Sequence, residues 1–274
     1  MSITATASPP GYSLRSALRV AGWLGLALII VIISLSDFLA AGTSGTIGIG
    51  PFLAPPSATF RFGTDILGRD MLSETLHGLS MTLQAAVPAA LIALFFGALS
   101  GFSVAGLAMP IALILRWLVG TLAALPALLL AVLFIGLTTR EWASLAAGLA
   151  AAPLGFVRVF DRVRRNARAV HVHYAHATGI SHTALLRRDL VYEFRQEFST
   201  SVARTLASVT TILSTVSFLG FGMEPPHRDL GLMIAASKPY YPGAWWTAAF
   251  PALALAILIL FARLAAGFDE GGQP

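Results

Sequence analysis

The sequence predicts an all-α integral membrane protein with about six transmembrane helices. Of 274 residues, 56% are hydrophobic and only 11% are charged, and the mean hydropathy is +0.77. Charged residues usually make up about a quarter of a soluble domain, so this chain is too poor in charge to build a water-facing surface. Its apolar residues also gather in stretches of about 20, the length that crosses a bilayer as a helix.

The first apolar stretch follows two basic residues, Arg15 and Arg19, and runs from about residue 20 to residue 40. It continues to Asp37 without a small-residue cleavage site, so we expect a membrane anchor rather than a removable signal peptide. Residues 1–19 are then predicted to be a cytoplasmic segment.

Residues 41–80 are predicted to lie outside the membrane. The first part is rich in Gly, Pro, Ser and Thr and is predicted to be a linker. From residue 62 to residue 80, apolar side chains recur at mostly helical spacing beside Asp65, Arg69 and Glu74. We therefore expect an amphipathic segment that lies along the interface or packs beside the bundle.

Residues 81–268 are predicted to form the core of the protein, with five further spans. Between residues 81 and 139 the only charged side chain is Arg116, and this stretch is long enough for two helices joined by a turn at 106–110. The remaining spans fit residues 143–160, 199–221 and 244–264, with polar loops at 161–198 and 222–243 and a tail at 269–274.

The basic residues predict the orientation. Eighteen residues are Lys or Arg, and they concentrate in the 161–198 loop, which the positive-inside rule places in the cytoplasm. Six spans then put both termini in the cytoplasm, in agreement with Arg15, Arg19 and Arg263. Because the charge lies between apolar stretches, it indicates a membrane surface rather than nucleic acid.

Three segments are distinctive beyond their hydropathy. The first and the third also have a local explanation. In the first, Asp65 could N-cap a helix, and in the third, Gly and Pro could end a helix after residue 217. The first segment is FGTDILGRD, with Phe62, Gly63, Thr64, Asp65, Leu67, Gly68, Arg69 and Asp70. The second is LPALLLA at 125–131, and the third is SFLGFGMEPP at 217–226, with Phe218, Leu219, Gly220, Gly222, Pro225 and Pro226.

In this order and at these spans, the segments closely resemble the permeases of the dipeptide, oligopeptide and nickel ABC importers. The resemblance is to the second of the two permeases in such systems and extends from about residue 15 to residue 265. It implies an ABC type I importer permease fold and a multi-pass protein of a bacterial inner membrane. Peptides are the first expected cargo, and nickel or a metal chelate is the next.

The resemblance also implies partners. A second, homologous permease would form the other half of the translocation path, and one or two ABC ATPase subunits would bind ATP and Mg²⁺. A substrate-binding protein would dock outside, touching 41–80 and 222–243. Alternating access would follow from ATP-driven movement of the ATPases. For this chain itself we expect no cofactor, no resident metal and no catalytic residue.

The cytoplasmic loop departs from the family. Similar permeases dock into the ATPase through a Glu-Ala-Ala pattern followed by Gly, and here those positions correspond to His173, Tyr174, Ala175 and Gly179, with Ser181 beyond. Tyr192 stands near the family's Leu-Pro. Either the ATPase has compensating changes or coupling through this loop is weaker. His173 and His176 would share a helix face, where an ATPase-contacting surface is expected over a metal site.

The path-lining residues are the least defined part of the prediction. The fifth span offers a polar stripe that includes Ser208, Thr211, Ser214 and Thr215. These hydroxyls either line the path or bond neighbouring helices, and the sequence leaves both possibilities open.

Other functions are less well supported. A Walker A sequence ends in Gly-Lys-Ser or Gly-Lys-Thr, whereas the single lysine, Lys238, precedes Pro239. Ser100 lies in a span without a histidine to activate it, which disfavours an intramembrane protease. An ion-coupled secondary transporter is the main alternative, with Arg116 and Arg204 as the only candidate buried charges.

Overall fold

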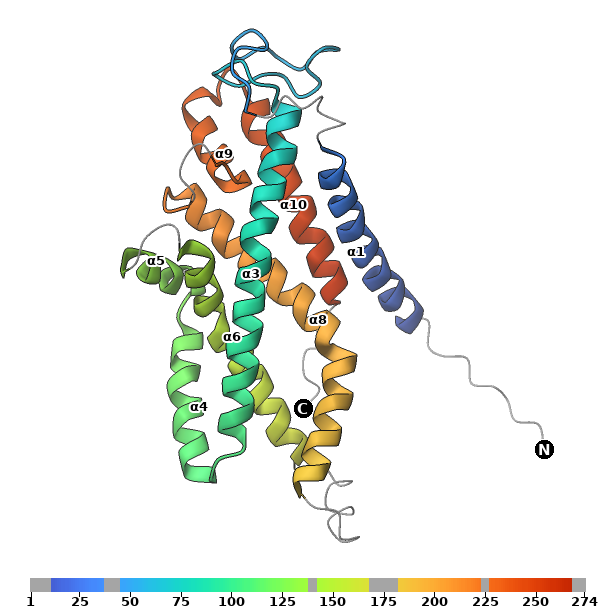
Figure 1. The fold of residues 1–274 in the computed structure, drawn as a ribbon, viewed down its shortest axis with the longest axis vertical. Helices are drawn as coiled ribbons and strands as arrows, with labels where there is room; N and C mark the ends of the chain where they lie inside the picture. Colours follow the sequence, from blue (N-terminus) through green and yellow to red (C-terminus); the bar gives the residue numbers. More distant parts are fainter. Residues whose placement is uncertain (1–10, 37–44, 138–141, 168–181, 223–226, 268–274) are drawn as a thin grey trace, which may run out of the picture.

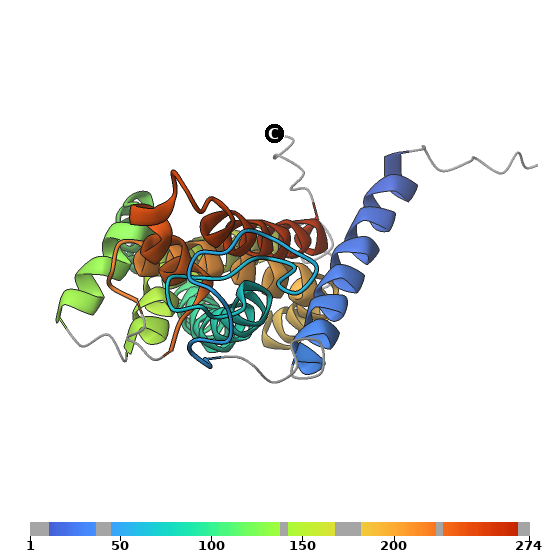
Figure 2. The same cartoon turned by 90° about the horizontal axis from the view of Figure 1, so that it is seen from above.

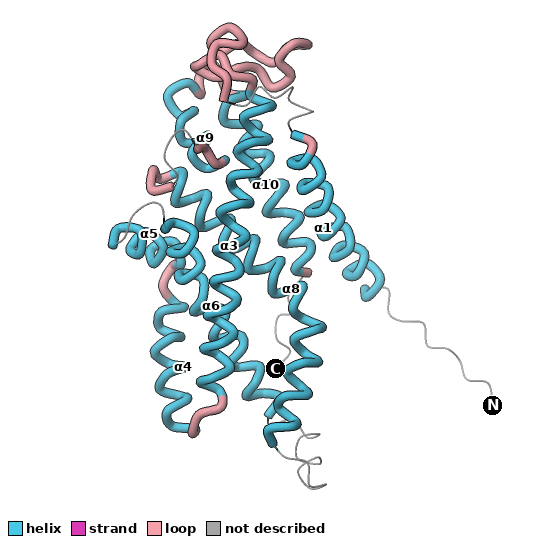
Figure 3. Tube along the Cα trace, in the orientation of Figure 1, coloured by secondary structure: helices cyan, strands magenta, loops and turns pink. Residues whose placement is uncertain are grey.

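The structure is a computed structural model that describes residues 11–36, 45–137, 142–167, 182–222 and 227–267. Within these residues every regular element is a helix, and the long helices run roughly side by side (Figures 1 and 3). The elements are α1 (Gly11–Ser34), α3 (Met71–Ala105), α4 (Met109–Ala124), α5 (Ala127–Leu137), α6 (Ala143–Ala167), α8 (His182–Phe218), α9 (Leu230–Ser237), η2 (Lys238–Tyr240) and α10 (Trp246–Ala266).

The described helices support an all-α membrane protein but only part of the predicted span count. Four of them, α1, α3, α6 and α10, are long and apolar enough to cross a membrane, and α4 with α5 adds a fifth if the bent pair is one span. The predicted span at 199–221 falls in α8, which does not pass the same test. Its many Ser and Thr residues and Arg204 lower its apolarity, although it packs in the middle of the bundle.

The amphipathic segment predicted at 62–80 is not a separate helix. Residues 62–70 form turns, and the helical part begins at Met71 as the first turns of α3. Since a residue adds 1.5 Å to a helix, the 35 residues of α3 extend about 50 Å, well beyond a hydrocarbon core of about 30 Å. The polar start of α3 is therefore the part of a span that projects past the apolar layer.

The third predicted span is broken in the middle. The turn predicted at 106–110 is confirmed, because α3 ends at Ala105 and α4 begins at Met109. The LPALLLA segment then bends the chain by 91° between α4 and α5. Leu125 is extended, with ψ 142°, because the ring of Pro126 disfavours a helical conformation in the residue before it.

The loop predicted at 222–243 contains a buried helix. Helix α9 is short, but Leu230, Gly231 and Met233 are buried, and it packs against α3, α8 and α10. Glycine permits this close fit: a Cβ on Gly231 would lie 2.3 Å from the carbonyl oxygen of Ser214. The sequence predicted a loop here because prolines and polar residues flank the short apolar segment that forms α9.

Small residues also join the long helices. Helices α3 and α6 share the most extensive contact, and a Cβ on Gly97 would lie 2.9 Å from the carbonyl oxygen of Ala152. Gly22 of α1 lies closer still to α10, since a Cβ there would lie 2.1 Å from the backbone nitrogen of Ala265. Such close backbone approach is typical of helix packing in membranes. Seen from above, α1 lies at one edge of the bundle and α4 with α5 at the other (Figure 2).

The two ends of the bundle differ. The non-helical residues 45–70, which we call the cap, lie over one end beside α9 (Figures 1 and 2). The opposite end carries the short α3–α4 turn and the end of α6 (Figure 1). The molecule thus has one end with extensive loop structure and one end of helix termini.

Candidate functional site

The cap is built on two glycines of the FGTDILGRD segment. Gly63 and Gly68 have φ angles of +75° and +67°, a left-handed conformation that glycine adopts without steric cost. Each also approaches another part of the cap: a Cβ on Gly63 would lie 2.6 Å from the oxygen of Ala54, and one on Gly68 would lie 2.3 Å from the oxygen of Gly50. These positions therefore require glycine for two separate reasons.

The side chains of Thr64 and Asp65 close the cap from inside. The Thr64 hydroxyl donates to the oxygen of Pro51 and accepts from the N–H of Ala54 at 2.8 Å. One Asp65 oxygen accepts from the N–H groups of Leu67 and Arg69 at 2.8 and 2.9 Å. Asp65 therefore stabilises a turn and does not N-cap a helix.

The N-cap of α3 is Asp70. Its carboxylate accepts from the N–H groups of Leu72 and Ser73 at 3.4 and 3.2 Å, and this satisfies donors that a helix start leaves unpaired. The cap thus ends in the residue that begins the longest apolar helix, so a displacement of the cap would act directly on α3.

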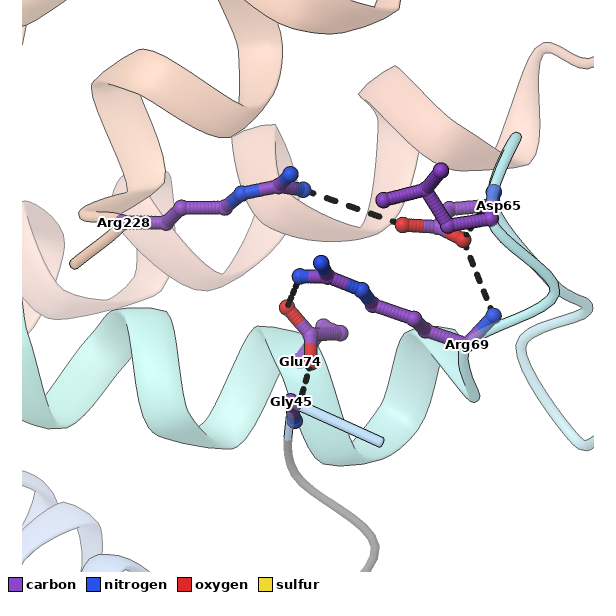
Figure 4. A network of polar contacts seen from close by, with 6 residues as sticks. Gly45, Asp65, Arg69, Glu74 and Arg228 are labelled. Carbon is purple, nitrogen blue, oxygen red and sulfur yellow. Dashed lines mark hydrogen bonds and ion pairs between the residues drawn. The ribbon is translucent and has the colours of Figure 1, made fainter. Parts of the chain in front are cut away.

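Two ion pairs connect the cap to α3 and to the residues before α9 (Figure 4). Arg69 lies 3.6 Å from Glu74, and Arg228 lies 3.7 Å from Asp65. Both ion-pair distances exceed the 2.7–2.9 Å of a strong charge-assisted hydrogen bond. Glu74 also accepts a hydrogen bond from the N–H of Gly45 at 2.7 Å. Asp65, Glu74 and Arg228 line a small cavity of about 80 Å³.

Aromatic residues attach the cap to α10. The ring of Phe62 stacks on Phe250 with centroids 3.9 Å apart, and the indole N–H of Trp246 donates to the oxygen of Thr64 at 3.1 Å. Leu67 contributes its carbonyl oxygen to the N–H of Gly48. Every residue of the segment that we singled out thus has a contact within the cap or to its supporting helices.

The SFLGFGMEPP segment ends α8 and holds α9. Gly220 has a φ of +92° just after the helix end, and a Cβ on Gly222 would collide with Ser217. The hydroxyl of Ser217 donates to Asp229, which also accepts from the N–H of Leu232 at 2.7 Å. Leu219 is exposed, and Pro225 and Pro226 lie outside the described residues.

Asp229 is a buried carboxyl at the start of α9. Burial raises its pKa above the ordinary value, although the hydrogen bonds from Ser217, Leu232 and Gly231 act in the opposite direction. The neighbouring N–H of Leu230 donates to the hydroxyl of Thr82 on α3 at 3.1 Å. At the other end of α9, the ammonium of Lys238 lies 3.7 Å from the ring centroid of Phe218, the last residue of α8.

The predicted hydroxyl stripe on α8 divides into two parts. Ser208, Thr211 and Thr215 each donate to the carbonyl oxygen four residues earlier in α8, and Thr211 is exposed. Ser214 is turned away from this face and is buried. Ser214 follows Thr211 at the same three-residue spacing at which Thr211 follows Ser208, so its burial against neighbouring helices, and not the helical repeat, separates it from the other three.

The two arginines considered for ion coupling do not form an isolated buried charge. Arg116 of α4 makes a bidentate pair with Asp161 of α6, with distances of 3.0 and 2.8 Å, and both side chains are about one-third exposed. Arg164 of α6 donates to the oxygen of Leu107 in the α3–α4 turn at 2.9 Å. Arg204 of α8 is half-buried.

The predicted coupling residues belong to the 161–198 stretch. His173, Tyr174, Ala175, Gly179 and Ser181 lie outside the described residues, as does the side chain of Tyr192. Among the residues that the structure describes, no group of three or more His, Cys, Asp or Glu is placed to hold a metal ion. The pairing of Arg116 with Asp161 was missed because the two are 45 positions apart and no local pattern connects them.

Comparison with known proteins identifies the family. No family model matches the chain. A di/tripeptide transport system permease of Pseudomonas aeruginosa is 31% identical over 227 residues, covering 77% of this chain and 73% of that protein. A peptide transport system permease of Haemophilus influenzae is 30% identical over 234 residues, covering 82% and 79%. A putative peptide transport system permease of Brucella suis is 26% identical over 249 residues, covering 88% and 83%.

These relatives match along most of the chain, and two of them are at least 30% identical to it. The chain belongs to the family of membrane permease subunits of ABC peptide transport systems.

Proposed function

We propose that this chain forms one half of the translocation path of an ATP-driven importer that carries peptides by alternating access. A second, homologous permease supplies the other half, and one or two ATPase subunits bind ATP and Mg²⁺ and dock on the loop that contains 168–181. A substrate-binding protein delivers the peptide at the cap. The names of the relatives, which include a di/tripeptide and a peptide transport permease, support peptides as the cargo.

The observation that carries the proposal is the hydroxyl face of α8, formed by Ser208, Thr211 and Thr215. Helix α8 packs against α3, α5, α6, α9 and α10, and yet this face remains partly open, with Thr211 exposed. Polar groups at membrane depth are typically found facing protein or a water-filled cavity. A partner subunit that meets this face would enclose a polar path between the two permeases.

The hydroxyl face has the polarity that a peptide requires. Each of these hydroxyls gives its proton to the helix backbone, so toward a ligand it can act only as an acceptor, through its two lone pairs. A peptide presents backbone N–H donors along its whole length. Weak, repeated acceptors of this kind suit a transporter, because the cargo must bind without being held.

The absence of cysteine from the chain makes a direct test possible. The chain would be expressed with its genomic neighbours and reconstituted in vesicles, and uptake of a labelled peptide would be measured with ATP. Thr211→Cys would then be treated with a charged, membrane-impermeant thiol reagent in nucleotide-free and vanadate-trapped states. Leu253→Cys, at an exposed apolar site of α10, is the matched control.

We expect ATP-dependent peptide uptake and a labelling rate at Thr211→Cys that differs between the two states, with no labelling at Leu253→Cys. Uptake that follows an ion gradient without ATP would instead indicate a secondary transporter. If the complex instead takes up nickel or a metal chelate, and peptide does not compete, the proposed cargo would be wrong. The proposed role as a permease would still hold.

A further inference from the structure

A large, mainly apolar pocket lies between α3, α6 and α8. Its volume is about 410 Å³, within the range of 300–1,000 Å³ that is usual for small-ligand sites. Leu91, Phe95 and Leu99 of α3 and Leu154 of α6 supply much of the apolar lining, and all four side chains are exposed, so the pocket opens at the surface of the bundle. The cap is built from other residues, so this pocket is separate from it.

One wall of the pocket belongs to the hydroxyl face of α8. Ser201, Thr205 and Ser208 line it, and their spacing of four and three residues places them on one side of a helix. Ser208 also belongs to the face with Thr211 and Thr215 that we propose to line the path. The pocket is therefore continuous along α8 with the proposed path.

The charge in the pocket has a single sign. Arg158 of α6 lines it, and the lining residues that the structure describes include no Asp or Glu. A carboxylate among apolar side chains needs a cationic or hydrogen-bonding partner, and the exposed guanidinium of Arg158 provides five N–H donors in a geometry that fits a carboxylate. Five donors allow Arg158 to keep its contacts within the protein and still bind a ligand.

We propose that this pocket binds the C-terminal end of a transported peptide that ends in an apolar residue. The apolar side chain lies against Leu91, Phe95 and Leu154, and the terminal carboxylate faces Arg158 and the α8 hydroxyls. The inference rests on the proposed function, since the ligand must reach the pocket through the path. A phospholipid acyl chain would also fit the apolar wall, but its methyl end has no group that could pair with Arg158.

The test compares peptides that differ only at the C-terminal end. Uptake of Ala-Ala-Phe, Ala-Ala-Ser and the amide of Ala-Ala-Phe would be measured in the reconstituted complex with saturating binding protein. Ala98→Trp fills the pocket from α3, and Ala256→Trp makes the same change at an exposed site of α10 outside it. Arg158→Gln and Arg158→Lys test the carboxylate contact. Because every variant uses the same binding protein, its own preference cancels in the ratios between variants.

We expect Ala98→Trp to lower the uptake of Ala-Ala-Phe relative to Ala-Ala-Ser by roughly tenfold, the effect of about one lost apolar contact in a pocket. Ala256→Trp leaves the ratio unchanged. Arg158→Gln removes the preference for the free acid over the amide, and Arg158→Lys retains part of it. Equal ratios in all variants, with uptake intact, would overturn the pocket assignment but not the permease function.

A second measurement does not depend on whether Ala98→Trp assembles. Thr205→Cys would be labelled with a thiol reagent, and we expect Ala-Ala-Phe to slow the labelling while its amide has a weaker effect. Protection by an anionic phospholipid but not by the peptide would overturn the proposal in favour of a lipid site. If the unmodified complex shows no ATP-dependent peptide uptake, the proposed function itself would be contradicted.

Discussion

Glycines in the cap show how a single residue determines local structure. Gly48 and Gly68 share a left-handed backbone, with φ angles of +76° and +67°, but only Gly68 lies close to another backbone atom. The two residues therefore separate the conformational requirement for glycine from the steric one.

We predict that Gly68→Ala destabilises the protein more than Gly48→Ala does. Both variants place a Cβ in a left-handed conformation, which costs about 1–2 kcal/mol. A Cβ at residue 68 would also lie 2.3 Å from the oxygen of Gly50, whereas one at residue 48 would meet no atom within 4 Å. Thermal unfolding in detergent measures the difference, and equal melting temperatures would contradict the close contact.

Asp229 predicts a pH dependence of stability. Burial raises the pKa of this carboxyl, so between the unfolded and folded pKa values the folded state binds more protons than the unfolded state does. The contribution of Asp229 to stability therefore falls as pH rises through that window and is least favourable above the folded pKa.

Asp229→Asn removes this titration and keeps an oxygen that can accept from Leu232. We expect the melting temperature of the natural protein, measured relative to Asp229→Asn, to rise as pH is lowered from neutral toward the carboxyl range. Asp70→Asn, at the N-cap of α3, is the comparison variant. A difference that is independent of pH would show that Asp229 has no raised pKa.

At the scale of whole elements, contacts between α4 and α6 connect the bent third span to the helix that leads into the predicted cytoplasmic loop, 161–198. Arg116 and Asp161 join the two helices directly, and Arg164 holds the α3–α4 turn. A movement of α6 would therefore carry α4 with it.

We predict that Asp161→Asn uncouples ATP hydrolysis from transport more than it destabilises the chain. A partly exposed ion pair contributes only about 0–1 kcal/mol to stability, so the complex should still assemble. Peptide transported per ATP hydrolysed should decrease. Arg116→Gln should have the same effect, and the double variant should add little to either single change. Additive effects would show that the two residues act separately.

The elements differ in how far the sequence could predict them. The turn at 106–110 and the beginning of α6 at Ala143 were predicted correctly, because Gly, Pro and charged residues punctuate long apolar stretches there. The beginning of α3 was misplaced because its polar first turns resemble an interfacial helix, although they continue a span. Helix α9 was missed because eight residues are too few to show a helical period among loop residues.

The candidate site was predicted unevenly for a similar reason. The FGTDILGRD residues were identified from a resemblance, but their contacts with Phe250, Trp246 and Arg228 join residues more than 150 positions apart. On α8, Ser214 follows Thr211 at the same spacing at which Thr211 follows Ser208, so the sequence alone did not separate it from the exposed hydroxyls; its burial against neighbouring helices does. The ion pair between Arg116 and Asp161 could not be derived from the sequence either.

The whole molecule has one end rich in basic residues, and this predicts its sidedness. Arg19 at the beginning of α1 lies against Gly267 after α10, and Arg263 lies in the last turn of α10. The end of α6 adds Arg164 and Arg165. The cap end carries Arg61, Arg69, Arg228 and Lys238, of which Arg69 and Arg228 lie within 4 Å of Glu74 and Asp65.

The positive-inside rule counts basic residues in short loops next to spans, so the cap is predicted to face outward and the α3–α4 turn to face the cytoplasm. Ile47→Cys in the cap and Ala108→Cys in the turn place exposed thiols at opposite ends of the same bundle. In spheroplasts, whose outer membrane is permeable but whose inner membrane is unbroken, an impermeant thiol reagent should label Ile47→Cys only. Ala108→Cys should react after the membrane is opened. The reverse pattern would place the loop with 168–181 outside, where an ATPase could not reach it, and would contradict both the orientation and the proposed coupling.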